Sequence, residues 1–411
     1  GSDGISFIQT AEGALAEVES MLQRCRELSV QASNDVTTLD DKKAIQQEIE
    51  ALMGEIDRLA SDTEFNTKSI LDGTCCRQTS SSNTGVSLIS MTDDVALTTY
   101  SLTVTQASTK TNVTTGALGM GEKDKFTKDG KVQINGQTIE IKQGETLEEA
   151  YAKIRDCCES MNIDVLPVNG KDANGNPKEV ALSGATSLYF ESKIYGASRN
   201  IEITTDDPEL ATKLGVNGAV ITQGKDAIVS LDTDSGFTKT ATTFIDGNRV
   251  TVSDRGGFEM IFNVAGAEAG MDADVTVLDA GFVAIQIGSN EGQSIDISIP
   301  AVTCESLNIN YCNVCTFDGA QESITLFDEA ISQVSAVRAK LGAYENRLDS
   351  ATTSLDTTSQ NLTEACSRIE DVDMAAEMTE YTQLTVLSQA GTSMLAQANN
   401  RPQTILQLLQ G

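Results

Sequence analysis

One apolar stripe near the C-terminal end constrains the fold more than any other feature of the sequence. Its members follow one another at alternating intervals of three and four positions, and all except Thr358 are apolar: Phe327, Ala330, Val334, Val337, Leu341, Tyr344, Leu348, Ala351, Leu355, Thr358, Leu362, Ala365, Ile369 and Val372. Such a stripe keeps facing one partner only if the helix supercoils slightly around that partner. At 1.5 Å per residue the helix would run about 70 Å, whereas helices of globular proteins average about 11–12 residues. The stripe therefore predicts a rod.

The N-terminal end carries matching stripes. The first comprises Ile8, Ala11, Leu15, Val18, Leu22 and Cys25, and Leu28 continues its apolar face. The second comprises Ile45, Ile49, Leu52, Ile56 and Leu59, in a helix that Asp40 or Asp41 can cap. Helical ends around a different middle predict that the two ends pack together, as an antiparallel bundle of three long helices with the middle inserted.

Residues 373–411 continue the apolar pattern with few charges. The apolar positions are Met374, Met378, Tyr381, Leu384, Leu387, Met394, Leu395, Ile405, Leu406, Leu408 and Leu409. The residues between them are mostly uncharged Gln, Thr, Ser and Asn. A helix of this kind is marginal on its own, so we expect it to need a partner surface.

The middle of the chain, residues 95–283, changes to a β pattern. Val, Ile and Thr alternate with polar residues, and an Asn-Gly turn at Asn135 joins two predicted strands over 132–141. A second hairpin is predicted over 245–252, and Thr146 is predicted to cap a short helix. The fold class predicted for the whole chain is therefore α+β, a long helical rod built from both termini with a mainly β insertion.

The composition excludes several classes of function. The 411 residues include 29 Lys and Arg against 60 Asp and Glu, a net charge of −31, and no His. So acidic a surface repels phosphate groups, so we expect no nucleic-acid partner and no membrane. Without imidazole, Ser–His and Cys–His pairs, HExxH zinc sites and His-ligated haem are all impossible. No phosphate loop or dinucleotide turn is complete and no acidic pair stands out, so the sequence predicts no enzyme and no cofactor.

The nine cysteines form no recognisable framework. They are Cys25, Cys75, Cys76, Cys157, Cys158, Cys304, Cys312, Cys315 and Cys366. Reduced thiols are the favoured interpretation, because adjacent cysteines rarely reach disulfide geometry with each other. A four-thiolate zinc site from Cys75, Cys76, Cys312 and Cys315 is a weaker hypothesis. The segments 172–175 and 232–236 hint at calcium loops, but neither has the full ligand series, and solvated turns are favoured.

Several ordered motifs occur at both ends of the chain. At the start they are DGISFIQTAEGAL (3–15), LQRCRELSVQA (22–32), EI (48–49), EIDR (55–58) and TEFN (63–66). Towards the end they are IGSNEGQ (287–293), LGAYENRL (341–348), SRIEDVD (367–373), QAGTSMLAQAN (389–399), PQ (402–403) and LL (408–409). With these motifs the chain resembles bacterial flagellin, the filament subunit of the flagellum, and the middle corresponds by position to that family's variable outer domains.

The resemblance implies a domain organisation. Residues 1–73 and 284–372 would form the core rod, 74–94 a β and loop connection, 95–283 the exposed insertion, and 373–411 the inner-core helix. The family's usual N-terminal segment, which pairs with that last helix, has no counterpart here, so the resemblance implies a chain that begins downstream of it.

The resemblance also implies function and partners. The expectation is a secreted, extracellular structural subunit that polymerises into the flagellar filament and serves motility. The family's C-terminal helix docks an export chaperone, here over 373–411, and the flagellin-sensing Toll-like receptor of animal hosts would contact Arg24, Leu28 and Glu48. A hook-associated junction protein is the alternative within the same assembly. A secreted enzyme with activity in 95–283 is the alternative of another class.

Overall fold

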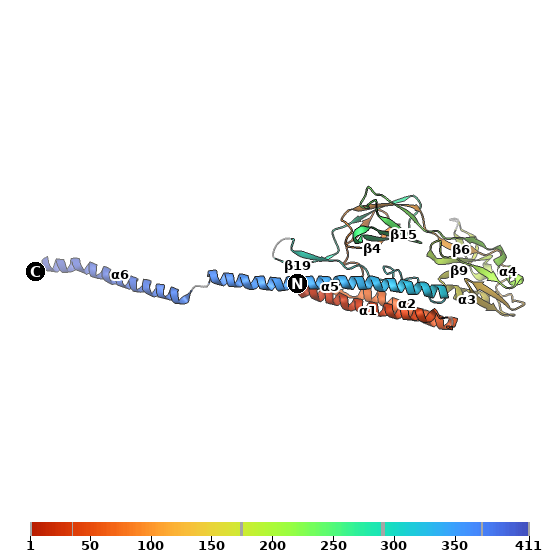
Figure 1. The fold of residues 1–411 in the computed structure, drawn as a ribbon, viewed down its shortest axis with the longest axis horizontal. Coiled ribbons are helices and arrows are strands. Elements are labelled where there is room, and N and C mark those ends of the chain that lie inside the picture. The colour runs from red at the N-terminus through yellow and green to blue at the C-terminus, as the bar shows by residue number, and fades with distance from the viewer. Residues whose placement is uncertain (1, 35, 173–175, 289–291, 371–372, 410–411) are drawn as a thin grey trace.

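Four long helices dominate the computed structural model, which describes residues 2–34, 36–172, 176–288, 292–370 and 373–409 (Figure 1). They are α1 (Ser2–Ala32), α2 (Leu39–Asp62), α5 (Phe317–Glu370) and α6 (Met374–Leu409). Helix α1 packs against both α2 and α5. Its direction is opposite to that of α5, because Glu12 and Glu19 reach Arg338 while Arg26 reaches Asp328. The predicted antiparallel three-helix bundle is thus confirmed.

Helix α2 begins differently from the sequence prediction. Its N-cap is Thr38, whose hydroxyl accepts a hydrogen bond from the backbone N–H of Asp41 at 3.2 Å. The Asp41 carboxylate accepts in return from the Thr38 N–H, which completes a capping box, so neither Asp40 nor Asp41 is the cap. The buried face also differs: Met53 and Ala60 are buried, while Leu52 and Leu59 are only partly covered.

Helix α5 is longer than predicted, and its stripe is only half buried. The helix begins at Phe317, and Ala320 and Ser323 extend the buried face backwards from Phe327. The burial ends at Leu348, because α1 begins level with that residue. Beyond it the stripe faces solvent: Leu355, Leu362 and Ile369 are 40, 65 and 85% exposed. Within the described chain the stripe is therefore covered only as far as Leu348, and Val372 lies outside the described residues.

The insertion forms two lobes: one, with β4 and β15, lies beside α5, and the other, with β6, β9, α3 and α4, lies at the end of the helical bundle (Figure 1). Lobe one contains two four-stranded antiparallel sheets, ordered β14-β5-β18-β3 and β15-β16-β17-β4. A shared core that includes Tyr100, Phe237 and Phe262 lies between them. The strands are β3 (Thr79–Ser81), β4 (Ser87–Met91), β5 (Thr99–Gln106), β14 (Ile228–Leu231), β15 (Thr242–Asp246), β16 (Arg249–Ser253), β17 (Glu259–Asn263) and β18 (Met271–Val277). Two of these strands, β3 and β4, thus lie before residue 95, where the sequence analysis placed the start of the insertion.

Lobe two combines two sheets with two short helices, α3 (Leu147–Glu159) and α4 (Pro208–Lys213). The sheets are ordered β10-β9-β11-β6-β13 and β12-β7-β8, and they share a core with the apolar face of α3. The strands are β6 (Lys110–Thr114), β7 (Gly130–Ile134), β8 (Gln137–Ile141), β9 (Ile163–Lys171), β10 (Pro177–Glu179), β11 (Ser187–Tyr195), β12 (Ile203–Thr205) and β13 (Val220–Thr222).

Both predicted hairpins and the predicted cap in the insertion are confirmed. The β7–β8 turn has Asn135 and Gly136 at φ of 45° and 83°, the left-handed conformation that an Asn-Gly pair tolerates. The β15–β16 hairpin turns at Gly247, whose φ is 59°. Thr146 caps α3 in a capping box with Glu149.

Two small hairpins connect the insertion to the rod. The first follows α2 and consists of β1 (Glu64–Phe65) and β2 (Lys68–Ser69). The second precedes α5 and consists of β19 (Val283–Gln286) and β20 (Ser294–Ile297). Ile295 and Ile297 of β20 are buried in the core of the rod, so the returning chain is anchored there before the last long helix begins.

Candidate functional site

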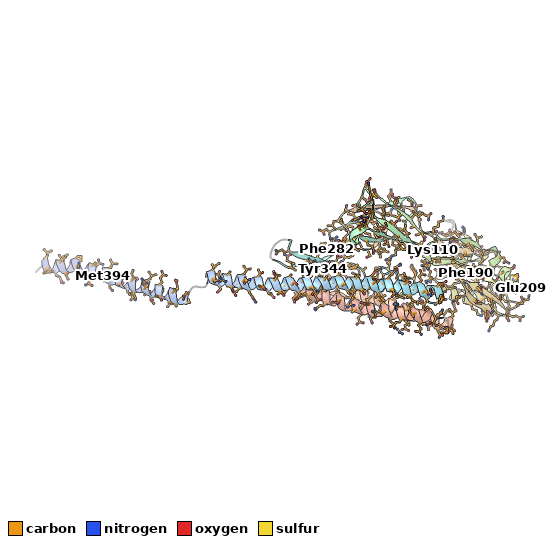
Figure 2. All side chains as sticks on the ribbon, viewed as in Figure 1. Lys110, Phe190, Glu209, Phe282, Tyr344 and Met394 are labelled. Carbon is orange, nitrogen blue, oxygen red and sulfur yellow. The ribbon has the colours of Figure 1, made fainter. Side chains whose placement is uncertain are left out.

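Most of the exposed large apolar side chains of the described residues lie on the far half of α5 and on α6. We call the following set the distal stripe: Leu355, Leu362, Ile369, Met374, Met378, Tyr381, Leu384, Leu387, Met394, Leu395, Ile405, Leu406, Leu408 and Leu409, all of them exposed. No described residue of α6 is buried. Figure 2 shows Met394 on α6, well clear of the insertion and of the bundle. So many exposed apolar side chains on two consecutive helices mark an interaction site.

The sequence of α6 provides a helix cap but few charged side chains to face the solvent. Its first turn is capped by Asp373, whose carboxylate accepts from the Ala375 N–H at 2.9 Å. Its charged residues are Glu377, Glu380 and Arg401, and the remainder is apolar or uncharged. Most of the stability of a helix in a protein comes from packing of its apolar face, and α6 has no such packing within the described chain. A second surface must therefore supply it.

Arg24 and Glu48 form an ion pair across the exposed face of α1 and α2. Arg24 Nη2 and Nε donate to Glu48 Oε1 at 2.8 and 3.1 Å, and Arg24 Nη1 lies 3.5 Å from Glu27 Oε2. The hydrogen bond and charge of Glu48 raise the pKa of the guanidinium. The side chains are 49 and 48% exposed, so the pair contributes little to stability and is available to a partner.

The third residue expected on that face is not on it. Leu28 follows Arg24 by one turn of α1, but its side chain belongs to the core of the rod and is 2% exposed. It has almost no surface to offer a partner. The structure thus brings Arg24 and Glu48 together and separates Leu28 from them by burial, so Leu28 can affect binding only through the position of α1.

The cysteines are unpaired thiols, most of them in the core. Cys25, Cys75, Cys157, Cys158, Cys304, Cys312 and Cys315 are buried, Cys76 is half-buried and Cys366 is exposed. Burial raises the pKa of Cys25 and of Cys312 to about 12 and that of Cys315 to about 11, so these thiols stay protonated at neutral pH. Within the part of the chain that the structure describes, no three His, Cys, Asp or Glu residues are grouped so that they could hold a metal ion. The zinc hypothesis therefore has no structural support.

Of the two suspected calcium loops, only the segment 232–236 is described in full, and it gives no ligand cluster. In the segment 232–236 the Asp232 carboxylate accepts from the Asp234 N–H at 2.9 Å, and its carbonyl accepts from the Ser235 hydroxyl at 2.6 Å. These bonds close a turn. The other segment includes residues 173–175, which lie outside the described residues. A search of the described helices also finds none with the length and apolarity to cross a membrane.

Polar bridges between the insertion and the rod were not foreseen from the sequence. Arg199 of lobe two donates to both carboxylate oxygens of Glu322 on α5, at 2.8 and 2.6 Å. Arg249 of lobe one donates to the backbone carbonyls of Glu305 and Ser306. Lys340 on α5 pairs with Asp93. These partners are far apart in the sequence and follow no periodic pattern, so only the tertiary structure identifies them.

Comparison with known proteins finds similarity to flagellins at both ends of the chain and over nearly its whole length. The bacterial flagellin N-terminal helical region matches residues 1–75, and the bacterial flagellin C-terminal helical region matches residues 324–409. A flagellin of Clostridium tyrobutyricum is 32% identical over 401 residues, 98% of this chain and 82% of that protein. A flagellin of Salmonella typhimurium is 29% identical over 452 residues, 99% of this chain and 86% of its own length. The solved structure of FliC from Burkholderia pseudomallei covers 84% of this chain at 17% identity, with a TM-score of only 0.27.

Long helices from both ends of the chain, one of them with an exposed apolar face, joined to a β insertion, are the architecture of a structural subunit. The identity to known flagellins extends over nearly the whole sequence. The chain belongs to the bacterial flagellin family. It is a subunit of the flagellar filament, it is exported to form that extracellular filament, and it assembles with other flagellin subunits.

Proposed function

We propose that the distal stripe is the surface through which this subunit polymerises. One observation carries the proposal: α6 has no buried residue although large apolar side chains recur along it, at intervals of three and four from Met374 to Leu387. Burial of apolar area gives about 25 cal/mol per Å², so helices of this kind gain most of their stability when neighbouring copies cover them. The acidic insertion lies on the other part of α5 and stays in solvent.

A single charge in the stripe tests this proposal. Leu384→Asp puts a carboxylate into the apolar face, whereas Gln383→Asp puts the same carboxylate on the next residue, outside the stripe. Both variants would be expressed by a flagellated bacterium, with filaments counted by electron microscopy and exported subunit measured in the medium. We expect the Leu384 variant to be exported and to form few or no filaments, and the Gln383 variant to polymerise. Normal filaments from both would refute the proposal.

We propose further that the export chaperone covers the same stripe within residues 373–411 before assembly. The support is chemical: an exposed apolar helix needs a cover in the cell, and Leu384 and Leu395 are 59 and 64% exposed. Binding of the purified chaperone to the whole chain, followed by fluorescence anisotropy, should be weakened by Leu384→Asp and unchanged by Gln383→Asp. Equal affinity for both variants would show that the chaperone binds elsewhere.

For host recognition we propose that the Arg24–Glu48 pair is contacted by the flagellin-sensing Toll-like receptor. The pair is half exposed and ordered by its own hydrogen bonds, as anchors of a binding surface should be. In a direct assay with the receptor ectodomain, Arg24→Ala should weaken binding much more than Arg58→Ala, whose guanidinium pairs with Glu55 and Asp62 on α2 alone. Equal binding by these two variants would refute the contact. Because Leu28 is buried, Leu28→Ala would affect receptor binding by shifting α1 and not by removing a direct contact.

A further inference from the structure

A cavity of about 610 Å³ with a mixed polar and apolar lining lies where the two lobes meet the rod. Lobe one contributes Asn248 and Arg249, lobe two contributes Arg199, and the segment before α5 contributes Asn310 and Tyr311. Ligand cavities of proteins span about 300–1,000 Å³ and occur preferentially at junctions between domains. Neither assembly nor receptor recognition, as proposed above, involves this cavity.

The lining contains many side chains that donate or accept hydrogen bonds. Eight asparagines line it, together with five carboxylates and two guanidiniums. An amide side chain donates and accepts at once, a carboxylate only accepts, and a guanidinium only donates. The lining can therefore form hydrogen bonds with a ligand that has both donors and acceptors.

Part of this capacity is unused within the described chain. The Nε of Arg199 is buried and has no hydrogen-bond partner, although the other nitrogens of the same guanidinium bind Glu322. The side chains of Asp246, Glu305 and Asn310 also line the cavity, and no hydrogen bond joins them to another described residue. A buried donor without an acceptor is rare in folded proteins, and a hydroxyl oxygen of a bound ligand would satisfy this one.

We propose that this cavity binds a neutral oligosaccharide. An anion would meet five carboxylates against two guanidiniums, both of which already have partners. A simple ammonium ligand could pair with Asp246 and Glu305 but offers no lone pair to Arg199 Nε. A sugar hydroxyl donates to a carboxylate or an amide and accepts from the guanidinium. Tyr311, 54% exposed, adds a ring face for the C–H face of a pyranose.

The test uses the whole chain and three neutral probes: maltotriose, cellotriose and triacetylchitotriose. Saturation-transfer NMR would detect binding, and calorimetry would give the affinity. Asn310→Trp fills the cavity, and its matched control, Asn400→Trp, puts the same ring on exposed α6. We expect at least one trisaccharide to bind, with affinity reduced by about tenfold or more in the Asn310 variant and unchanged in the control.

Asp246→Ala is a second cavity variant, to be used if the Asn310 variant does not fold. It removes one accepting carboxylate from a hairpin that keeps its backbone pairing. It should weaken the same trisaccharide by about threefold to tenfold. Absence of binding by all three probes would overturn the proposal, as would equal affinity in the wild type and in the variants that fold. Spermidine binding that is lost in the cavity variants, without saccharide binding, would overturn it in favour of a cation site.

Discussion

Leu348→Ala tests the structure most directly, because Leu348 is the last fully buried member of the α5 stripe. Its side chain is 0% exposed and lies against α1 at Gly4. Truncation removes three carbons and leaves a cavity, which costs about 2–5 kcal/mol for Leu→Ala. Because the bundle ends here, Ile285 can move into part of the space. We therefore expect Leu348→Ala to lower the free energy of unfolding by about 2–3 kcal/mol, near the lower end of that range.

Leu362→Ala is the matched control. It is the same substitution in the same stripe two heptads further on, but Leu362 is 65% exposed. Surface changes of this kind usually stay within about 0.5 kcal/mol. Urea unfolding followed by far-ultraviolet circular dichroism separates the two variants, because long helices dominate that signal. With an m value of about 3 kcal/mol/M, Leu348→Ala should lower the midpoint by about 0.7–1 M and Leu362→Ala hardly at all.

Equal midpoints for the two variants would refute the assignment of where the bundle ends. The same pair should behave differently in assembled filaments. There the distal stripe is expected to be covered by neighbouring copies, so Leu362→Ala should weaken the filament although it leaves the monomer intact. Depolymerisation by heat, followed by light scattering, measures this second effect.

Three further predictions rest on single residues. Gly13→Ala should raise the free energy of unfolding by about 0.5–1 kcal/mol, because a β-carbon there meets no atom within 4 Å. Gly4→Ala should raise the free energy of unfolding by less, because its β-carbon would come 2.5 Å from Ile285 Cδ1. Iodoacetamide at pH 8 should label exposed Cys366 quickly and spare Cys25, whose pKa burial raises to about 12; equal labelling by mass spectrometry would contradict this. Burial, aided by Asp93, raises the pKa of Tyr344 to about 12, so the folded chain holds a proton that the unfolded chain releases near pH 10. This contribution to stability is complete below about pH 10 and is lost as the pH rises towards 12, and Tyr344→Phe should flatten that part of the urea midpoint profile.

The sequence predicts the rod well because its stripes are long and periodic. A stripe defines which face of a helix is apolar, but it does not define what covers that face. This is why Leu341 and Leu355 look alike in the sequence while one is buried and the other exposed. The same limitation applies to Leu28, which shares a motif with Arg24 yet belongs to the core.

Short-range chemistry in the insertion was equally predictable. The turn at Asn135 and the cap at Thr146 depend on neighbouring residues alone. The α2 cap was misassigned because Asp41 is a member of the capping box rather than its first residue. The cavity between the lobes could not be predicted, because Arg199, Arg249 and Asn310 come together only through the docking of three separate units.

The insertion leaves and rejoins the rod at a single point. Strand β3 pairs with β18, and the backbone of Gln78 exchanges hydrogen bonds with Leu278 and Ala280. At Gly281 a β-carbon would come 2.2 Å from the carbonyl oxygen of Cys76, so the outgoing and returning strands touch. A module with adjoining ends can be lengthened, shortened or exchanged for another domain without changing the spacing of the helices beneath it. The outer surface of the filament can therefore diversify, or carry a grafted domain, while the pitch set by the rods stays the same.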